Sequence, residues 1–177
     1  METNSVKFFN SNIINSPTFS PIVAAWQVKN PQNVGSLMRL VDNVGGKQLF
    51  LLDDENEKRI SQIKKTAGLS FNHVEICYKD SADFLQNIPE GYQLCAVETS
   101  EGATNIFQTC LPEKIILLVG SEAHGLPEEL LSKADLSVFI PMTGECKSMN
   151  ISHALAVSLF EWQRQSLFMY ENSNQSK

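Results

Sequence analysis

Short, nearly uninterrupted apolar runs alternate with longer polar or amphipathic stretches along most of this chain, and this alternation most constrains its fold. The segment KIILLVG, from Lys114 to Gly120, is the clearest of the apolar runs. Such a continuous run is typical of a strand that is buried on both faces, as in a parallel sheet covered by helices. The sequence therefore predicts an α/β fold with a mostly parallel sheet and helices on both faces.

The expected elements follow from composition and periodicity. The expected strands are Ile22–Val28, Gln48–Leu52, Val74–Cys77, Gln93–Val97, Lys114–Gly120 and Leu136–Ile140. The expected helices start at Asn30-Pro31 and stop at Gly45-Gly46, span Glu57–Thr66 and Ser81–Asn87, and close the chain from about Ser148 to Phe168. Asn30 is a good N-cap and Pro31 suits the first helical position. Ser81 is expected to cap its own helix.

The length of 177 residues and the 42% hydrophobic content favour one globular domain. Residues 1–20 are expected to form a loosely ordered N-terminal arm, residues 21–168 the single domain, and residues 169–177 a polar tail. No apolar run is long enough to cross a bilayer, so no membrane association is expected. The N-terminus lacks the pattern of a signal peptide, which predicts a cytoplasmic location.

The formal net charge of -6 is unfavourable for contact with phosphate groups. Basic residues are nevertheless concentrated in two places, around Lys29, Arg39 and Lys47 and at Lys58, Arg59, Lys64 and Lys65. A local basic face is compatible with an acidic whole, although a solvated helix face explains Lys58 and Arg59 equally well. The four cysteines show neither CxxC pairs nor zinc spacing, so no metal is expected.

In parallel sheets, ligands bind beyond the carboxyl ends of the strands. The sequence contains neither GxGxxG after its first strand nor a P-loop, which disfavours a conventional dinucleotide or P-loop site. Three other blocks follow strands.

In the first, NPQNVGSLMRL, the spacing of Asn33 and Arg39 is expected to place both roughly on one side of a helix, away from its apolar stripe. Gly35 allows close backbone approach, and an arginine near a helix start suits a phosphate or ribose. A surface arginine beside a capping asparagine is the alternative.

The second block, LLVGSEAHGLPEELL, runs from a buried strand into Gly120 and Gly125, where glycines allow a ligand to lie against the backbone. Glu122 is the single acid in this turn and is suited to orient an arginine or accept a ligand hydrogen bond. A charge partner for a helix N-terminus is its alternative role. His124 is expected to be a loop residue rather than a base.

In the third block, FIPMTGECKSMNISHALAVSLFEW, Pro141 and Gly144 direct the chain off the sheet. Ser148 and Asn150 then stand at a helix start, where they can cap the helix or hold a substrate. The helix has two apolar faces, one with Ile151, Leu155, Ser158, Leu159 and Trp162 and the other with Ala154, Val157 and Phe160. Two apolar faces are typical of a helix that packs on a sheet and also on a partner.

Together the three blocks resemble the motifs of the SPOUT methyltransferases, in particular the SpoU (TrmH-like) family of RNA ribose 2′-O-methyltransferases. The resemblance extends from Val23 to about Arg164. Each block matches one motif: Asn33 with Arg39, Gly120 with Glu122, and Ile140-Pro141-Met142 followed by Ser148-Met149-Asn150. Met149 replaces the leucine of the family's motif, and the segment KKTAGLSFNHVEI also looks like its family counterpart.

The resemblance implies a deep trefoil knot in the C-terminal part, a homodimer built partly on the last helix, and an RNA substrate. It also implies S-adenosyl-L-methionine as methyl donor, held by residues that line the knot: Val97, Gly120, Ile140, Ser148 and Met149. The implied catalytic residues are Arg39, Asn33, Glu122, Ser148 and Asn150. Because a guanidinium is normally protonated, Arg39 is better suited to polarise the ribose hydroxyl or grip its phosphate than to accept a proton.

The function expected from this resemblance is methyl transfer to a ribose 2′-hydroxyl of RNA, with tRNA favoured over rRNA because the chain is small. Arg39, on the first helix, is expected to reach a pocket that the other subunit completes. Two alternatives remain open, namely a non-catalytic RNA-binding homodimer of the same fold and an RNA base methyltransferase. The acidic net charge motivates the former, whereas the pairing of Asn33 with Arg39 argues against the latter.

Overall fold

One seven-stranded sheet organises the protein. The computed structural model describes residues 4–11, 17–54 and 59–175. The strands are β1 (Ile22–Trp26), β2 (Gln48–Leu52), β3 (Glu75–Lys79), β4 (Gln93–Val97), β5 (Thr104–Asn105), β6 (Ile115–Val119) and β7 (Leu136–Phe139). Their order is β3-β2-β1-β6-β4-β7-β5, and every neighbouring pair is parallel. The predicted parallel sheet is confirmed.

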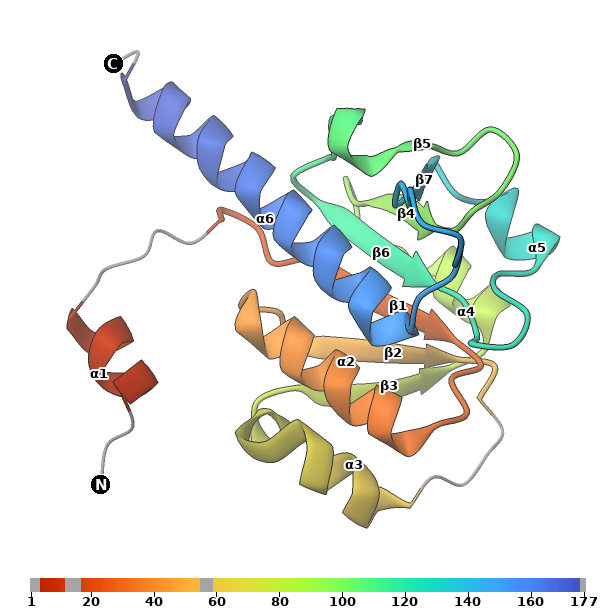
Figure 1. Cartoon of the computed structure of the whole chain (residues 1–177), viewed down its shortest axis with the longest axis horizontal. Helices are drawn as coiled ribbons and strands as arrows, with labels where there is room; N and C mark the ends of the chain where they lie inside the picture. The colour runs from red at the N-terminus through yellow and green to blue at the C-terminus, as the bar shows by residue number, and fades with distance from the viewer. Residues whose placement is uncertain (1–3, 12–16, 55–58, 176–177) are drawn as a thin grey trace.

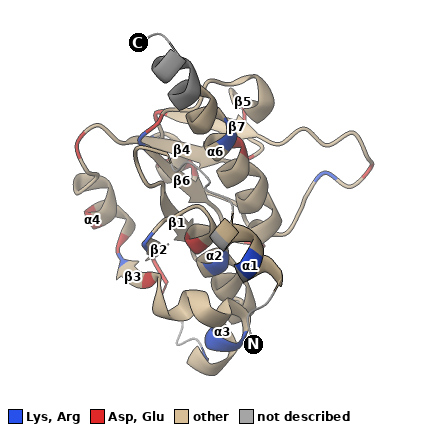
Figure 2. Cartoon of the chain, turned by 90° about the vertical axis from the view of Figure 1, so that its left-hand side faces the viewer, with Lys and Arg blue, Asp and Glu red and all other residues tan. Residues whose placement is uncertain are grey.

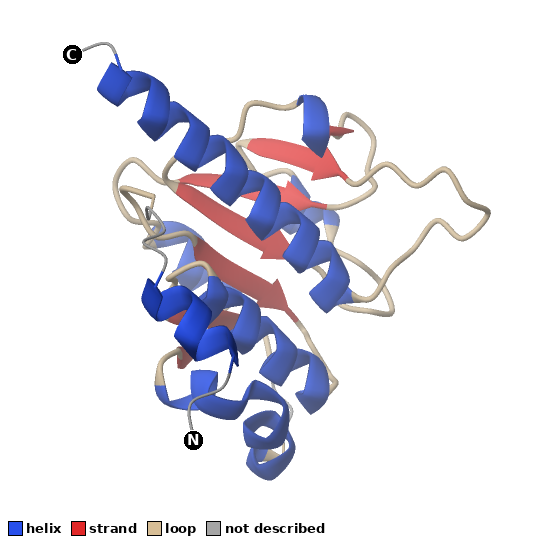
Figure 3. Cartoon of the chain, turned by 60° about the vertical axis from the view of Figure 1, so that its left-hand side comes forward, coloured by secondary structure: helices blue, strands red, loops and turns tan. Residues whose placement is uncertain are grey.

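Helices cover both faces of the sheet (Figure 1). One face carries α2 (Pro31–Asn43), α3 (Ile60–Ala67) with the short 3-10 helix η1 (Gly68–Asn72), and α6 (Ile151–Gln175). The other carries α4 (Ser81–Gln86) and α5 (Glu128–Leu131). Figure 3 shows α2 and α6 crossing the same side of the strands. The arrangement with helices on both faces is therefore confirmed.

The core is divided by the sheet into two apolar layers. Val23 and Leu117 face the layer beneath α2 and α6, where Trp162 is fully buried. Their neighbours Ala24 and Leu118 face the layer beneath α4 and α5. Since side chains alternate along a strand, a strand with both faces covered must be apolar throughout. All five residues of β6 are buried for this reason.

The first helix forms as its capping residues predict. The side chain of Asn30 accepts a hydrogen bond from the Gln32 amide at 2.9 Å, and Pro31 opens α2. At the other end the chain turns through Gly45, whose φ is +79°. Within α2, a Cβ atom on Gly35 would lie 2.7 Å from the Ile63 carbonyl oxygen of α3. The close backbone approach expected at Gly35 is confirmed, and it is an approach to a neighbouring helix.

The structure differs from the predicted boundaries in three helices. Helix α3 begins at Ile60 rather than Glu57; residues 57 and 58 lie outside the described part of the chain. Asp80, not Ser81, caps α4, because its carboxylate accepts the amides of the first turn. Helix α6 begins at Ile151 instead of Ser148 because Asn150 caps it. It continues to Gln175, since the expected polar tail contains neither glycine nor proline before that point.

Short elements account for the remaining differences. The sequence does not predict β5, α5 or η1, which are too brief to show a period. It also does not predict α1 (Asn4–Ser11) within the expected loose arm. Within the described residues, no helix has both the length and the apolar content needed to cross a bilayer.

Candidate active site

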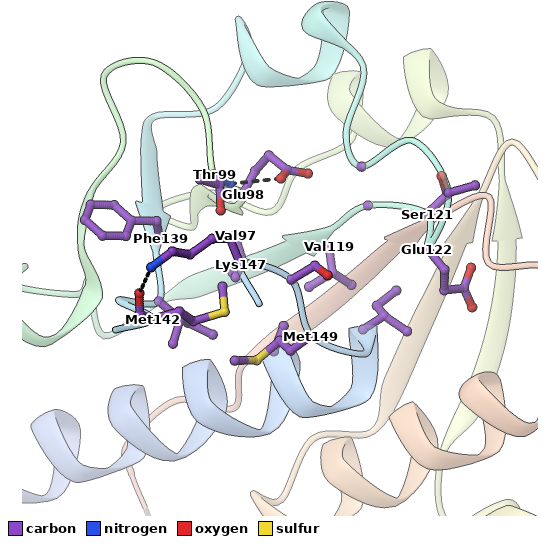
Figure 4. A pocket seen from close by; sticks show the side chains of 17 residues that line it. Val97, Glu98, Thr99, Val119, Ser121, Glu122, Phe139, Met142, Lys147 and Met149 are labelled. Carbon is purple, nitrogen blue, oxygen red and sulfur yellow. Dashed lines mark hydrogen bonds between the residues drawn. The ribbon is translucent and has the colours of Figure 1, made fainter. Parts of the chain in front are cut away.

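A cavity of about 260 Å³ opens at the carboxyl edge of the sheet (Figure 4). Its walls come from three segments, those that follow β4, β6 and β7. The strand order explains their meeting, because β6, β4 and β7 are direct neighbours in a parallel sheet and end at the same edge. This cavity thus lies where the site was predicted, beyond the carboxyl ends of strands.

The five residues expected to hold the methyl donor all line this cavity. Val97 is the last residue of β4, Gly120 follows β6 and Ile140 follows β7, while Ser148 and Met149 precede α6. Glu122 lines it as well. The structure brings these residues together, and their binding role remains a prediction.

The glycine turn after β6 is tight. Ser121 and Gly125 exchange backbone hydrogen bonds of 3.2 and 3.0 Å, which fold the chain back on itself. A Cβ atom on Gly120 would lie 2.2 Å from the carbonyl carbon of Gly125, closer than any Cβ contact allows. Only glycine fits at position 120 without a backbone shift, so the turn and the cavity wall depend on it.

Glu98 joins two of the cavity walls and was not predicted as a site residue. One of its carboxylate oxygens accepts the Leu126 amide and the other accepts the Thr99 amide, each at 2.9 Å. The first contact connects the segment after β4 to the turn after β6. Because Glu98 stands in none of the recognised motifs, only its place directly after a strand could have drawn attention to it.

Three of the expected catalytic residues form one hydrogen-bonded chain. The Asn33 side-chain amide donates to the Glu122 carboxylate at 2.5 Å. The Asn150 amide donates to the Asn33 side-chain oxygen at 3.2 Å. The Asn150 oxygen in turn accepts the Ser152 amide at the start of α6. The start of α2, the turn after β6 and the start of α6 are therefore held together beside the cavity.

Comparison with known proteins decides the family. The model of the SpoU rRNA Methylase family matches residues 20–160, which include the first two blocks, the third block as far as Phe160, and the cavity walls. The chain belongs to this family. The resemblance inferred from the sequence is confirmed.

The relatives of this chain include the tRNA (guanosine(18)-2′-O)-methyltransferase of Aquifex aeolicus. It is 30% identical over 145 residues, which make up 81% of this chain and 69% of that enzyme. The matched part is only 9% of the length of a mouse relative. The chain thus spans very different shares of the curated relatives it matches.

Solved structures show the same fold. A protein whose structure concerns the 2-OH methylation of C/U34 on tRNA has a TM-score of 0.74 and 28% identity; the match covers 82% of this chain and 95% of that one. The AdoMet-bound rRNA methyltransferase from Sinorhizobium meliloti has a TM-score of 0.77 and 26% identity, over 85% of this chain and 58% of that one.

Arg39 is not where the spacing of the first SpoU motif was expected to place it. Asn33 is buried, with 8% of its surface exposed, whereas Arg39 is exposed and does not line the cavity. The expectation of a shared side was wrong, because six residues at about 100° each leave two side chains roughly 120° apart. Within the described residues Arg39 has no ion pair.

The other residues considered for chemistry differ in exposure and in their hydrogen-bond partners. Ser148 is exposed at the cavity wall, and its carbonyl oxygen accepts the Cys146 thiol at 3.3 Å. His124 is exposed in the turn, as expected for a loop residue. Burial raises the pKa of the Cys95 thiol in β4 to about 12, so this cysteine stays protonated and unreactive. Among the described residues, no group of three or more potential metal ligands is found.

Proposed function

We propose that this protein transfers a methyl group from S-adenosylmethionine to a ribose 2′-hydroxyl of RNA, with tRNA favoured over rRNA as substrate. The observation that carries the proposal is the cavity between three strand ends, lined by residues of the second and third SpoU motifs, from Gly120 and Glu122 to Ser148 and Met149. The descriptions of the relatives support both the methyl donor and the RNA acceptor. The Aquifex aeolicus relative is named a tRNA 2′-O-methyltransferase, and the Sinorhizobium meliloti structure holds AdoMet.

The chemistry of the cavity fits an adenosyl ligand. Its volume of about 260 Å³ lies just below the range of roughly 300–1,000 Å³ typical of small-molecule sites. Val97, Ile140 and Met149 supply apolar surface for a flat ring. The carboxylates of Glu98 and Glu122 suit a donor that carries positive charge on its sulfonium and its amine.

The donor supplies a methyl group that is already activated on its sulfonium. The protein then has to align the ribose oxygen with that carbon, as the C–O bond forms, the C–S bond breaks and the hydroxyl proton leaves to solvent. Asn33, hydrogen-bonded between Glu122 and Asn150, lies beside the cavity and would help to position the ribose. Ser148, exposed on the wall, has a hydroxyl able to bind substrate.

Arg39 requires a second subunit in this proposal. It is exposed on α2 and outside the cavity of its own chain, so Arg39 of the partner subunit would reach a composite site. There its guanidinium would polarise the 2′-hydroxyl or hold the neighbouring phosphate, since both tasks suit a permanent cation with several donors.

The same proposal includes a homodimer through α6, a trefoil knot in the segment that leads to it, and a cytoplasmic location. Helix α6 buries Leu155, Leu159 and Trp162 against the sheet, while Phe160 stays 48% and Phe168 61% exposed. A row of exposed aromatics on a long helix is typical of a subunit contact. The motifs of the SpoU family support the knot, and the RNA substrates of the relatives support the location.

Isothermal calorimetry with S-adenosylmethionine tests the donor site. We expect one molecule to bind per chain, with S-adenosylhomocysteine competing for the same site. Adenosine alone should bind more weakly because it lacks the charged tail. A protein that binds neither compound would contradict the proposed function and would favour the non-catalytic alternative.

A further inference from the structure

The surface of α3 and η1 differs in charge from the rest of the chain. From Arg59 to Val74 the sequence contains three Lys or Arg residues and no Asp or Glu, in a chain whose net charge is -6. Arg59, Lys64 and Lys65 are all exposed. Within the described residues none of them has an ion-pair partner, whereas Lys79 and Arg164 elsewhere are each paired with a carboxylate.

Apolar groups lie among these cations. Leu69 on η1 is 78% exposed, more than the other exposed large hydrophobic residues of the described chain, and Ile60 is 54% exposed. The Lys64 ammonium lies 5.6 Å from the centre of the Phe71 ring, which holds this cation near the body of the protein. A surface that mixes unpaired cations with exposed apolar groups suits a ligand with both phosphates and flat or sugar surfaces.

The position of α3 connects this surface to the proposed chemistry. A Cβ atom on Gly35 of α2 would contact both Ile63 and Thr66, so the two helices pack closely. Arg39 stands four residues after Gly35, which is one helical turn along the same face of α2. In Figure 2 the blue segments of α2 and α3 lie on the side of the molecule that faces the viewer. The unpaired cations of both helices therefore border one surface.

We propose that the exposed face of α3 and η1, formed by Arg59, Lys64, Lys65 and Leu69, binds the RNA substrate beside Arg39. The lysines and arginine contact phosphates, and Leu69 contacts a base or ribose. This inference rests on the proposed function. It adds a surface that lies outside the donor cavity and that contributes to RNA binding alone.

Charge reversal at single positions tests this face. We expect Lys64→Glu and Lys65→Glu each to weaken binding of bulk tRNA about tenfold at low salt, and to reduce the slope of log K against log salt by about one. Lys133→Glu is the matched control, because Lys133 is exposed near α5 on the opposite face of the sheet. Leu69→Ser should weaken binding while leaving the salt slope unchanged.

Calorimetry with S-adenosylmethionine should give the same affinity for all four variants and the wild type. The melting temperature should fall slightly in Lys64→Glu and Lys65→Glu, which place a negative charge in the last turn of α3, and should stay near the wild-type value in the other two. Equal tRNA affinity in the wild type and both α3 charge variants would overturn this inference while leaving the proposed function intact. An equal loss in Lys133→Glu would also overturn it, because the effect would then follow net charge alone. A wild-type protein that binds the donor but no tRNA would contradict the proposed RNA substrate itself.

Discussion

Asn33 donates to Glu122 and accepts from Asn150, although these residues are 89 and 117 positions away in the chain. Motif matching predicted all three as site residues. Their mutual hydrogen bonds could not be predicted, because they depend on the order of the strands and on where α6 begins. The error at Arg39 has a similar origin, since spacing along one helix fixes an angle but not the neighbour that each side chain meets.

Asn33→Asp replaces the donated hydrogen bond with a second carboxylate facing Glu122. We expect the free energy of unfolding to fall by about 1–3 kcal/mol, because the buried side chain at position 33 can no longer donate to Glu122 and two like charges meet, while Asn150 can still donate to it. Urea denaturation measures this loss. Asn43→Asp, at the exposed end of the same helix, is the control and should change the stability little. Equal stability of the two variants would show that the hydrogen-bonded chain has no structural role.

Arg39→Ala should abolish methyl transfer to RNA, a loss of at least about a hundredfold, while S-adenosylmethionine still binds with wild-type affinity. The reason is that Arg39 lies outside the donor cavity of its own chain. Single-turnover transfer and calorimetry on the same preparation give both quantities. Wild-type turnover in this variant would refute its proposed catalytic role.

Among the elements, the long strands and helices could be predicted, and the short ones could not. Strand β6 is apolar throughout because helices cover both of its faces. By contrast, β5 has two residues and α5 four, which is about one period of a strand and of a helix, too short for either pattern to repeat. Helix caps were correct where one candidate existed, as at Asn30, and wrong where Asp80 and Ser81 competed. The turn after β6 was predicted from its glycines. Glu98, which accepts a hydrogen bond from Leu126 in that turn, belongs to none of the three motifs and was not predicted.

Gly120→Ala tests the turn as a unit. The added Cβ would meet the Gly125 backbone, which cannot move without opening the cavity wall. We therefore expect S-adenosylmethionine binding to weaken by at least about tenfold, or to be lost. Gly144→Ala is the matched control in the third cavity segment, because nothing lies within 4 Å of its Cβ position. Equal affinities in both variants would show that the turn does not shape the donor site.

At the scale of the whole molecule, the alternation of strands and helices predicted the parallel sheet but not its order. The chain places β6 between β1 and β4, so that three strand ends border one cavity. No local pattern specifies that order, because the apolar runs are interchangeable in composition. Composition alone could not distinguish one parallel α/β fold from another, and the three ordered motifs were needed to identify the family. The match over residues 20–160 confirms that family.

The proposed dimer makes a prediction at this scale. Light scattering should give twice the chain mass of 19.8 kDa for the wild type. Phe160→Glu should lower the measured mass toward that of the monomer. The face of α6 that is exposed in one chain would be buried in the dimer, and the new charge would be buried with it. Tyr78→Glu should remain dimeric, because it alters a similarly exposed aromatic residue on the edge strand β3, away from α6. A monomeric wild type would contradict the composite site.

The most direct test of the central claim is to incubate the purified protein with bulk tRNA and S-adenosylmethionine labelled in its methyl group, and then to analyse the nucleosides by mass spectrometry. The account predicts label in a nucleoside whose methyl group remains on the ribose fragment after the glycosidic bond is broken. Label on the base fragment would contradict ribose methylation. No label in either tRNA or rRNA, from a protein that binds the donor, would contradict methyl transfer to RNA.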